Sequence, residues 1–416
     1  MSTVTTEPRG AGADARWRDL DHLRRTSPMS DAVLDEVRGR HIRSGDHWLI
    51  DFASCNYLGF DWDAEIMDAI APAVRQWGTH PSWSRLIGNP RIYPEIEERL
   101  AALLGAPDTL LLPTATLIHA SVIPVLAGAG HVFVEARAHK TVYDGCVSAR
   151  GQGARLRRFR ADRPGELDAQ LRGTPHDGPL LVCLDGVDSM SGDIPDLPAL
   201  AGICREHGAT LYVDDTHGFG VIGERTAQET CPYGSRGNSV VRHTGESYDD
   251  IVLVGGFSKA YSSLLAFLAL PSALKEYLKV TAGPYLYSGP SPTASLATAL
   301  AGLSVNDRRG DTIRADLYRK TTRVLDHVRA LALDAHGTTG FPIVEFPLSD
   351  TADLDDVVRF LWDEGVYVTV AAYPLVPRAR VGFRVQLTAL NSDEDIDLLN
   401  DVLSRLAERA VLRRRG

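Results

Sequence analysis

The chain has 416 residues, of which 44% are hydrophobic and 24% are charged, and its formal net charge is −10. This composition is typical of a globular protein, and the length is sufficient for two domains or for one large domain with a smaller partner. The acidic balance gives no support for a protein that binds nucleic acid or an anionic membrane.

The amino-terminal stretch MSTVTTEPRGAGADAR is polar and has no apolar core, so we expect no signal peptide. No apolar run has the length of a transmembrane helix. The five cysteines are scattered, without a CxxC pair or a spacing typical of metal ligands: Cys55, Cys146, Cys183, Cys204 and Cys231. This distribution predicts a reduced, cytoplasmic protein with neither a structural disulfide nor a metal site.

Residues 1–58 are predicted to form an amino-terminal arm and a helix. The first fifteen residues are rich in Thr, Gly, Pro and Ala without periodicity, and we expect them to be disordered. Residues 17–43 have a charged helical pattern, and the following sequence HWLIDFA (47–53) is typical of a strand.

Residues 59–298 are predicted to form a large domain in which apolar strands alternate with helices. The expected strands span residues 108–113, 130–136, 178–186, 209–215 and 250–256, and a helix at 197–208 ends at a glycine. Because these strands are apolar without alternation, they favour a mostly parallel sheet that is covered on both faces. The polar, turn-rich segment 224–249 is expected to be a surface insertion.

Residues 299–416 are predicted to form a small α+β domain. Its expected strands lie within residues 341–348, 365–372 and 381–389. The last helix, 392–414, opens with Ser392 and Asp395 at capping-box spacing and ends in arginines, which suit the negative end of a helix dipole. We therefore expect an α/β protein with a large domain built on a mostly parallel sheet and a small α+β carboxyl-terminal domain.

Ligands of such sheets bind beyond the carboxyl ends of the strands. Those ends carry an aspartate (Asp214 or Asp215), His217 and Lys259. Each has an ordinary explanation, because the aspartate could cap a helix, the histidine could be a buried polar group and the lysine could reach solvent. Together they favour pyridoxal-phosphate chemistry, since a desolvated lysine forms a Schiff base readily and a buried carboxylate holds a pyridine nitrogen protonated.

Seven stretches carry a more specific signal. They are DFASCNYLGF (51–60), SRLIGNPRIYPEIEERLA (84–101), AHKTVYDG (138–145), DGVDSMSGDIPDLPAL (185–200), LYVDDTHGFGVIG (211–223), GGFSKA (255–260) and FRVQLTALNSDEDID (383–397). In content and order they resemble the α-oxoamine synthases, which include 8-amino-7-oxononanoate synthase, 2-amino-3-ketobutyrate CoA ligase, 5-aminolevulinate synthase and serine palmitoyltransferase. The resemblance implies a divergent member of this family, a fold-type I transferase with pyridoxal 5'-phosphate as its cofactor.

The resemblance also implies roles for individual residues. Lys259 would form the Schiff base and move the proton at the substrate α-carbon, Asp214 would pair with the pyridine nitrogen, and His139 would stack on the ring. His217 and Ser189 would lie at the phenolic oxygen of the ring. Further cofactor contacts are implied for Ala115, Thr116, Ser258 and Gly289, and substrate contacts for Arg384, Cys55, Asn56 and Arg85.

Two further basic residues bear on the roles assigned to the site. Arg384, from FRV, would grip the amino-acid carboxylate, which suits the geometry of a guanidinium group. Lys140, next to His139, is a rival for the Schiff base, but the strand–loop–lysine context of the family belongs to Lys259.

The chain departs from the family pattern at several positions near the expected site. These are Cys55 for asparagine, residues 78–85 for a Gly-rich segment, Tyr93 for histidine, Thr116 for an aromatic residue, and Gly256 and Gly289 for hydroxyl residues. The last two normally contact the phosphate, so we expect replacement donors from residues 114–116, Ser258 and Ser262 or Ser263, aided by a helix N-terminus. Either these are neutral rearrangements or the pocket is remodelled for an unusual substrate.

The activity implied by the resemblance is the decarboxylative condensation of an α-amino acid with an acyl thioester. Two alternatives stay open: another carbanion reaction of the same cofactor, such as transamination, racemisation or a different carbon–carbon bond formation, and a catalytically silent partner subunit. Lys259, Asp214 and His139 together argue against silence. A homodimer is also implied, in which residues 285–292 reach the neighbouring subunit. The sequence leaves open the amino acid, the acyl chain, and whether coenzyme A or an acyl-carrier protein carries the thioester.

Overall fold

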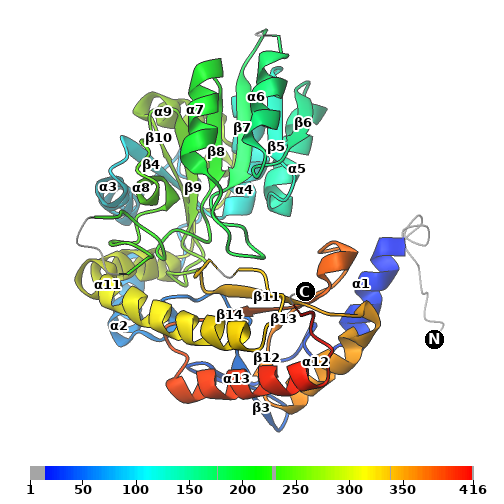
Figure 1. The fold of residues 1–416 in the computed structure, drawn as a ribbon. Helices are drawn as coiled ribbons and strands as arrows, with labels where there is room; N and C mark the ends of the chain where they lie inside the picture. Colours follow the sequence, from blue (N-terminus) through cyan, green and yellow to red (C-terminus); the bar gives the residue numbers. More distant parts are fainter. Residues whose placement is uncertain (1–14, 176, 227–230, 338, 415–416) are drawn as a thin grey trace, which may run out of the picture. The chain divides into compact units, whose positions relative to one another are not determined.

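A computed structural model describes residues 15–175, 177–226, 231–337 and 339–414, and the chain divides into two compact units (Figure 1). The larger unit is Asn56–Tyr318, and the smaller unit combines Met1–Cys55 with Arg319–Gly416. The expected boundary at residue 58 lies close to the first division, and the expected boundary at residue 298 lies inside helix α11 (Thr293–Ala330). No helix in the described ranges is long and apolar enough to cross a membrane.

A seven-stranded sheet with the order β4-β10-β9-β8-β7-β5-β6 forms the centre of the larger unit. Its strands are β4 (Asp108–Leu112), β5 (His131–Glu135), β6 (Arg155–Phe159), β7 (Leu180–Asp185), β8 (Thr210–Asp214), β9 (Ile251–Gly256) and β10 (Ala266–Leu270). Strand β10 is antiparallel to both of its neighbours, and the other pairs are parallel. The predicted mostly parallel sheet is therefore confirmed.

Helices cover both faces of this sheet, with α6 and α7 on one face and α4 and α5 on the other (Figure 1). The helices of the unit are η2 (Phe60–Trp62), α2 (Ala64–Trp77), α3 (Ile92–Leu104), α4 (Ala115–Ala127), α5 (Lys140–Gly151), α6 (Pro164–Arg172), α7 (Leu197–His207), α8 (Val240–His243), α9 (Ser272–Thr281) and α10 (Gly283–Leu286). Helix α7 matches the helix predicted at 197–208 and ends at the left-handed Gly208, with φ 65°.

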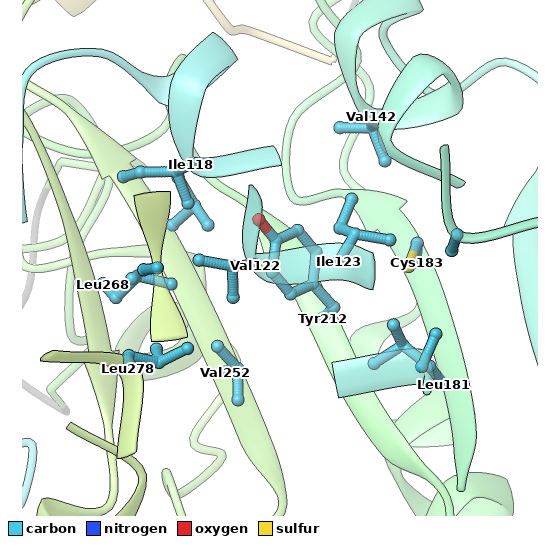
Figure 2. Close-up of a cluster of buried hydrophobic side chains, with 14 of the residues drawn as sticks. Ile118, Val122, Ile123, Val142, Leu181, Cys183, Tyr212, Val252, Leu268 and Leu278 are labelled. Atoms are coloured by element: carbon cyan, nitrogen blue, oxygen red, sulfur yellow. The ribbon is translucent and has the colours of Figure 1, made fainter. Parts of the chain in front are cut away.

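The core under α4 and α5 positions the cavity described below. Ile118, Val122 and Ile123 of α4 lie beside Tyr212 of β8, and all four side chains are fully buried (Figure 2). Burial of each large apolar side chain contributes roughly 1.5–3 kcal/mol. The start of α4 and the end of β8 are thereby packed in one rigid cluster.

The segment 224–249 is not simply the surface insertion that its polar sequence predicted. Asn238 is fully buried, accepts from the Glu224 backbone N–H at 2.8 Å and donates to the Leu103 carbonyl at 3.2 Å. Val240 and Val241 are also fully buried. The expectation failed because buried backbone and side-chain polar groups satisfy each other here, which a composition-based argument does not detect. Residues 227–230 of this segment lie outside the described ranges.

The smaller unit contains two sheets, with the orders β1-β2-β3-β12 and β11-β14-β13. Its strands are β1 (Glu36–Arg38), β2 (His41–Ser44), β3 (His47–Asp51), β11 (Ile343–Pro347), β12 (Val366–Tyr367), β13 (Thr369–Ala371) and β14 (Gly382–Gln386). Its helices are α1 (Ala15–Thr26), η3 (Thr351–Asp353), α12 (Leu354–Asp363), η4 (Arg378–Arg380) and α13 (Asp393–Glu408). The predicted capping box between Ser392 and Asp395 is present.

The helix predicted for residues 17–43 is wrong beyond Thr26. Pro28 follows soon after the end of α1, and residues 36–51 form a three-stranded antiparallel meander instead. Gly39 and Gly45 occupy the turns of this meander with φ of 59° and 58°. The disorder expected for the first fifteen residues concerns residues 1–14, which lie outside the described ranges, and Ala15, which begins α1.

Candidate active site

A cavity of about 250 Å3 opens at the carboxyl ends of β7, β8 and β9 in the larger unit, where ligands of such sheets bind. Its lining combines charged and hydroxyl side chains with a few apolar ones: Pro113, Thr114, Ala115, Thr116, His139, Thr141, Asp185, Val187, Ser189, Asp214, Thr216, His217, Ser258, Lys259, Leu264 and Leu265. All four predicted catalytic residues line it. Of the five further residues expected to contact the cofactor, Gly289 alone does not line it, whereas the other four do: Ala115, Thr116, Ser189 and Ser258.

Asp214 is the last residue of β8 and is held by three donors. Its Oδ2 atom accepts from His119 Nε2 at 3.0 Å, and its Oδ1 atom accepts from the Thr216 hydroxyl at 2.5 Å and from the Thr216 N–H at 3.0 Å. Burial alone would raise the pKa of Asp214, but its interaction with His119 and the hydrogen bonds from Thr216 hold that pKa well below its usual range. Asp214 is therefore a buried carboxylate that remains ionised.

The neighbouring Asp215 has a different environment. Its carboxyl group is fully buried, does not line the cavity, and accepts from the Val240 N–H at 2.9 Å. Burial, with a smaller contribution from the charge of Asp214, raises the pKa of Asp215 well above its usual range. Of the two aspartates left open by the sequence, Asp214 is the one that faces the cavity with a charge.

Lys259 lies in the turn that follows β9 and is half-buried at the cavity. Within the described part of the chain its ammonium group has neither a hydrogen-bond acceptor nor an ion-pair partner. Lys140, by contrast, is exposed on α5, forms an ion pair with Asp144 one turn later and does not line the cavity. A cation without a partner beside a cavity is available for a ligand, so the geometry favours Lys259 over its rival.

His139 and His217 both line the cavity, as does Asp185. The His139 backbone N–H donates to the Asp185 carboxylate at 3.0 Å, and its ring Nδ1 lies 2.8 Å from the Thr141 hydroxyl at the start of α5. His217 Nδ1 lies 2.8 Å from the Tyr57 hydroxyl. Burial and the charge of Asp214 raise the pKa of Asp185 well above its usual range.

The start of α4 supplies the groups expected to replace the missing phosphate contacts. Thr114 caps this helix by accepting from the Leu117 N–H at 3.2 Å, and Ala115, Thr116 and Ser258 also line the cavity. The free N–H groups at the start of a helix favour an anion. Ser262 and Ser263, the alternative donors, do not line the cavity.

Gly256 has a steric explanation. A Cβ atom at this position would lie 2.5 Å from Thr216 Cγ2, closer than such atoms pack. The Thr216 side chain thus occupies the space that a hydroxyl residue at position 256 would need, and its own hydroxyl is directed to Asp214. Gly289 does not line the cavity; the nearest side-chain atom to a Cβ there would be His80 Cε1, at 3.4 Å.

The predicted substrate-binding residues do not line this cavity. Arg85 is buried in an ion pair with Glu97 at 2.8 Å, donates to the Leu111 carbonyl and stacks over Tyr93 at 4.2 Å. Asn56 donates to Asp61 at 3.0 Å. Cys55 and Arg384 belong to the smaller unit, where the Arg384 backbone pairs with β11 and β13.

Sequence reasoning missed two groups that contact Asp214. His119 is the only ionisable side chain in the mainly apolar helical run ATLIHASVIPVLA, whose other polar side chains are Thr116 and Ser121. Thr216 follows Asp214 by two residues in the motif VDDTHG. The isolated histidine was a usable signal, but its partner lies 95 residues away and could not be assigned without the fold.

These residues fit pyridoxal phosphate. An ionised, buried carboxylate suits a protonated pyridine nitrogen, an unpaired lysine suits a Schiff base, and a helix N-terminus with hydroxyl groups suits a phosphate. All three lie around one cavity.

Comparisons with known proteins agree with this fit. Residues 48–403 match the family model described as aminotransferase class I and II. The chain is 32% identical to 8-amino-7-oxononanoate synthase of Pseudomonas putida over 375 residues, which cover 89% of this chain and 92% of the relative. A solved structure of SPT with PLP aligns with a TM-score of 0.85 and 25% identity, covering 95% of this chain and 96% of that one. Serine palmitoyltransferase of Sphingomonas wittichii aligns with a TM-score of 0.84 and 26% identity, covering 94% and 96%.

Proposed function

The chain belongs to the aminotransferase class I and II family and to its α-oxoamine synthases, and we propose that it condenses an α-amino acid with an acyl thioester, releasing CO2 and the free thiol. The enzyme uses pyridoxal phosphate, which supplies an electron sink for the carbanion that forms at the amino-acid α-carbon. The observation that carries the proposal is that one cavity is lined both by the ionised Asp214 and by Lys259, which has no ion-pair partner among the described residues.

The residues of the cavity then have separate tasks. Asp214 keeps the proton on the pyridine nitrogen, and Lys259 binds the cofactor covalently and moves the proton at the substrate α-carbon. His139, which lines the cavity, would stack on the ring. His217 and Ser189 would hold the phenolic oxygen, and the start of α4 with Ser258 would hold the phosphate.

We assign the amino-acid carboxylate to Arg384 of β14. A planar guanidinium group binds a carboxylate through two parallel hydrogen bonds. Arg384→Ala is expected to weaken amino-acid binding by roughly 1.5–3 kcal/mol, as measured by the spectral change of the cofactor during amino-acid titration. Arg380→Ala is the matched control, because Arg380 forms an ion pair with Glu345 within the same unit. Equal affinities in Arg384→Ala and wild type would remove the carboxylate assignment.

A homodimer is proposed on the apolar surface of two adjacent loops. Residues 79–88 and 285–293 lie side by side, joined by the Thr293 N–H to the Thr79 carbonyl and by His80 Nε2 to the Pro290 carbonyl. Their exposed large side chains include Ile87 (79% exposed) and Tyr287 (86% exposed). Such a patch is typical of an interface. Sedimentation of a fully active monomer at micromolar concentration would contradict this assignment.

We also propose a cytoplasmic enzyme, because all five cysteines are free although Cys146 and Cys183 are buried close to one another. The reaction is tested by incubating the enzyme with a panel of amino acids and acyl thioesters and analysing the products by mass spectrometry. An α-oxoamine with loss of CO2 is expected. A keto acid from transamination, or an amino acid returned with inverted configuration, would contradict the condensation. Parallel panels with coenzyme A and carrier-protein thioesters identify the acyl donor.

A further inference from the structure

Asp214 is linked through His119 to a second buried side chain of the same strand. His119 Nε2 lies 3.0 Å from Asp214 Oδ2, and His119 Nδ1 lies 2.9 Å from the Tyr212 hydroxyl. Both His119 and Tyr212 are fully buried. Tyr212 and Asp214 are two residues apart on β8, so both side chains point to the face of the sheet that α4 covers.

The surroundings of Tyr212 determine which nitrogen of His119 carries the proton. The Tyr212 ring lies among apolar side chains that include Val122 and Ile123 (Figure 2). Within the described residues, His119 Nδ1 is the only acceptor near its hydroxyl. A buried hydroxyl without an acceptor is costly, so the hydroxyl donates to Nδ1. Burial, with the charge of Asp214, also raises the pKa of Tyr212, which keeps this donor protonated.

A neutral imidazole that accepts at Nδ1 carries its proton on Nε2. His119 therefore donates to Asp214 without contributing a full positive charge. The carboxylate is stabilised as an anion, and its charge remains available for a cation in the cavity. A doubly protonated histidine would instead neutralise Asp214 and leave the pyridine nitrogen facing an ion pair.

We propose that His119 is a positioning residue for the cofactor, which the Tyr212 hydroxyl holds as the Nε2–H tautomer so that Asp214 stays ionised opposite the pyridine nitrogen. This inference rests on the proposed function, because it takes Asp214 as the partner of that nitrogen. It predicts that the proton shared by Asp214 and the ring moves toward Asp214 when the His119 donor is lost.

The test is the 15N signal of the ring nitrogen in holoenzyme loaded with pyridoxal phosphate that is 15N-labelled in the ring. In wild type we expect the pyridinium signal. In His119→Ala the balance should shift toward neutral pyridine by roughly tenfold to a hundredfold, since a hydrogen bond to a charged group is lost. His119→Asn retains an N–H donor and should restore part of the pyridinium signal. Tyr212→Phe should shift the signal in the same direction by less.

His131→Asn is the matched control. His131 is also buried and lies 3.2 Å from an aspartate, Asp177, but it is at the amino end of β5 and outside the cavity. If the role of His119 were purely structural, the His119 variants and His131→Asn would all have lower melting temperatures, and the 15N signal of the ring nitrogen would stay that of wild type. A pyridinium signal equal to that of wild type in both folded, loaded His119→Ala and Tyr212→Phe would overturn the proposal.

Failure of the proposed function gives a different result. A reaction other than condensation would appear in the product panel without changing the ring-nitrogen signals, and a wrong cofactor assignment would leave even the wild-type protein without pyridoxal phosphate on Lys259. With cofactor bound in wild type, the comparison of variants addresses His119 alone.

Discussion

The lysines at the two edges of the central sheet have different surroundings. At the amino ends of the strands the charges are paired: Lys275 Nζ lies 2.8 Å from Asp108 and 3.1 Å from Glu97, and Asp177 joins His131 to Arg155. At the carboxyl ends, Lys259 has no ion-pair partner in the described ranges. Lys275 is thus neutralised within the chain, whereas Lys259 at the cavity is left for a ligand.

Substitution of the two lysines should give the largest difference in effect between the two edges. Lys259→Ala is expected to lose covalently bound cofactor and to lower turnover by roughly 10²–10⁴-fold or more, the range for a lost proton-transfer group. Lys275→Ala should keep turnover and cofactor and lower the free energy of unfolding by about 1–3 kcal/mol. Cofactor content, steady-state rates and denaturant unfolding check both variants. Full turnover in Lys259→Ala would show that the lysine is not functional.

The adjacent aspartates offer a second comparison within one edge. Breaking a buried charge pair costs about 3–5 kcal/mol, so Asp214→Asn should lower turnover by at least about a hundredfold while some cofactor stays bound. Asp215→Asn should have a milder effect, since the raised pKa of Asp215 keeps its carboxyl group protonated. Measuring the rate of product formation by both variants tests which aspartate is the partner of the pyridine nitrogen. The reverse ranking would move the nitrogen partner by one residue.

The fit between Thr216 and Gly256 gives a smaller effect. Gly256→Ser would place its Cβ atom 2.5 Å from Thr216 Cγ2, and overpacking of this kind costs about 1–3 kcal/mol. We expect a lower melting temperature and weaker retention of pyridoxal phosphate. The double variant Gly256→Ser, Thr216→Ser removes the clashing Cγ2 atom, keeps the hydroxyl group that donates to Asp214, and should recover both properties. A single variant as stable as wild type would show that the two positions are independent.

The smallest expected effect is a pH dependence of stability. Asp215 has a folded-state pKa above its unfolded value of about 3.9, so the folded protein retains a proton that the unfolded chain has lost. Its contribution to stability is therefore full below about pH 3.9 and decreases as the pH rises toward the folded pKa. Relative to wild type, Asp215→Asn should gain stability between pH 4 and pH 7, as measured by urea unfolding. A constant difference would argue that Asp215 is ionised in the fold.

The sequence predicted the parallel sheet and the residues at its carboxyl edge because both follow from local patterns. Apolar runs define β5, β7, β8 and β9, and parallel strands bring their ends to one edge. Strand β6, RLRRF, was missed because an edge strand needs no apolar run, and β10 was missed because its apolar sequence follows the lysine turn without a clear boundary.

The polar contacts behind the site could not be predicted in the same way. His119 and Asp214 are joined only when α4 packs over β8, and the choice between Asp214 and Asp215 depends on which side chain faces the cavity. The segment 224–249 illustrates the same limit, since its buried Asn238 is satisfied by residues distant in the sequence. Composition describes how polar a segment is, but only the fold determines which hydrogen-bond partners its polar groups have.

The central claim is that pyridoxal phosphate binds in this cavity through Lys259. The most direct measurement is borohydride reduction of the purified holoenzyme, followed by proteolysis and mass spectrometry of the pyridoxyl-labelled peptide. We predict that the label is recovered on Lys259, in the peptide that contains GGFSKA. Recovery on Lys140, which is paired with Asp144, or on no lysine at all, would contradict the account.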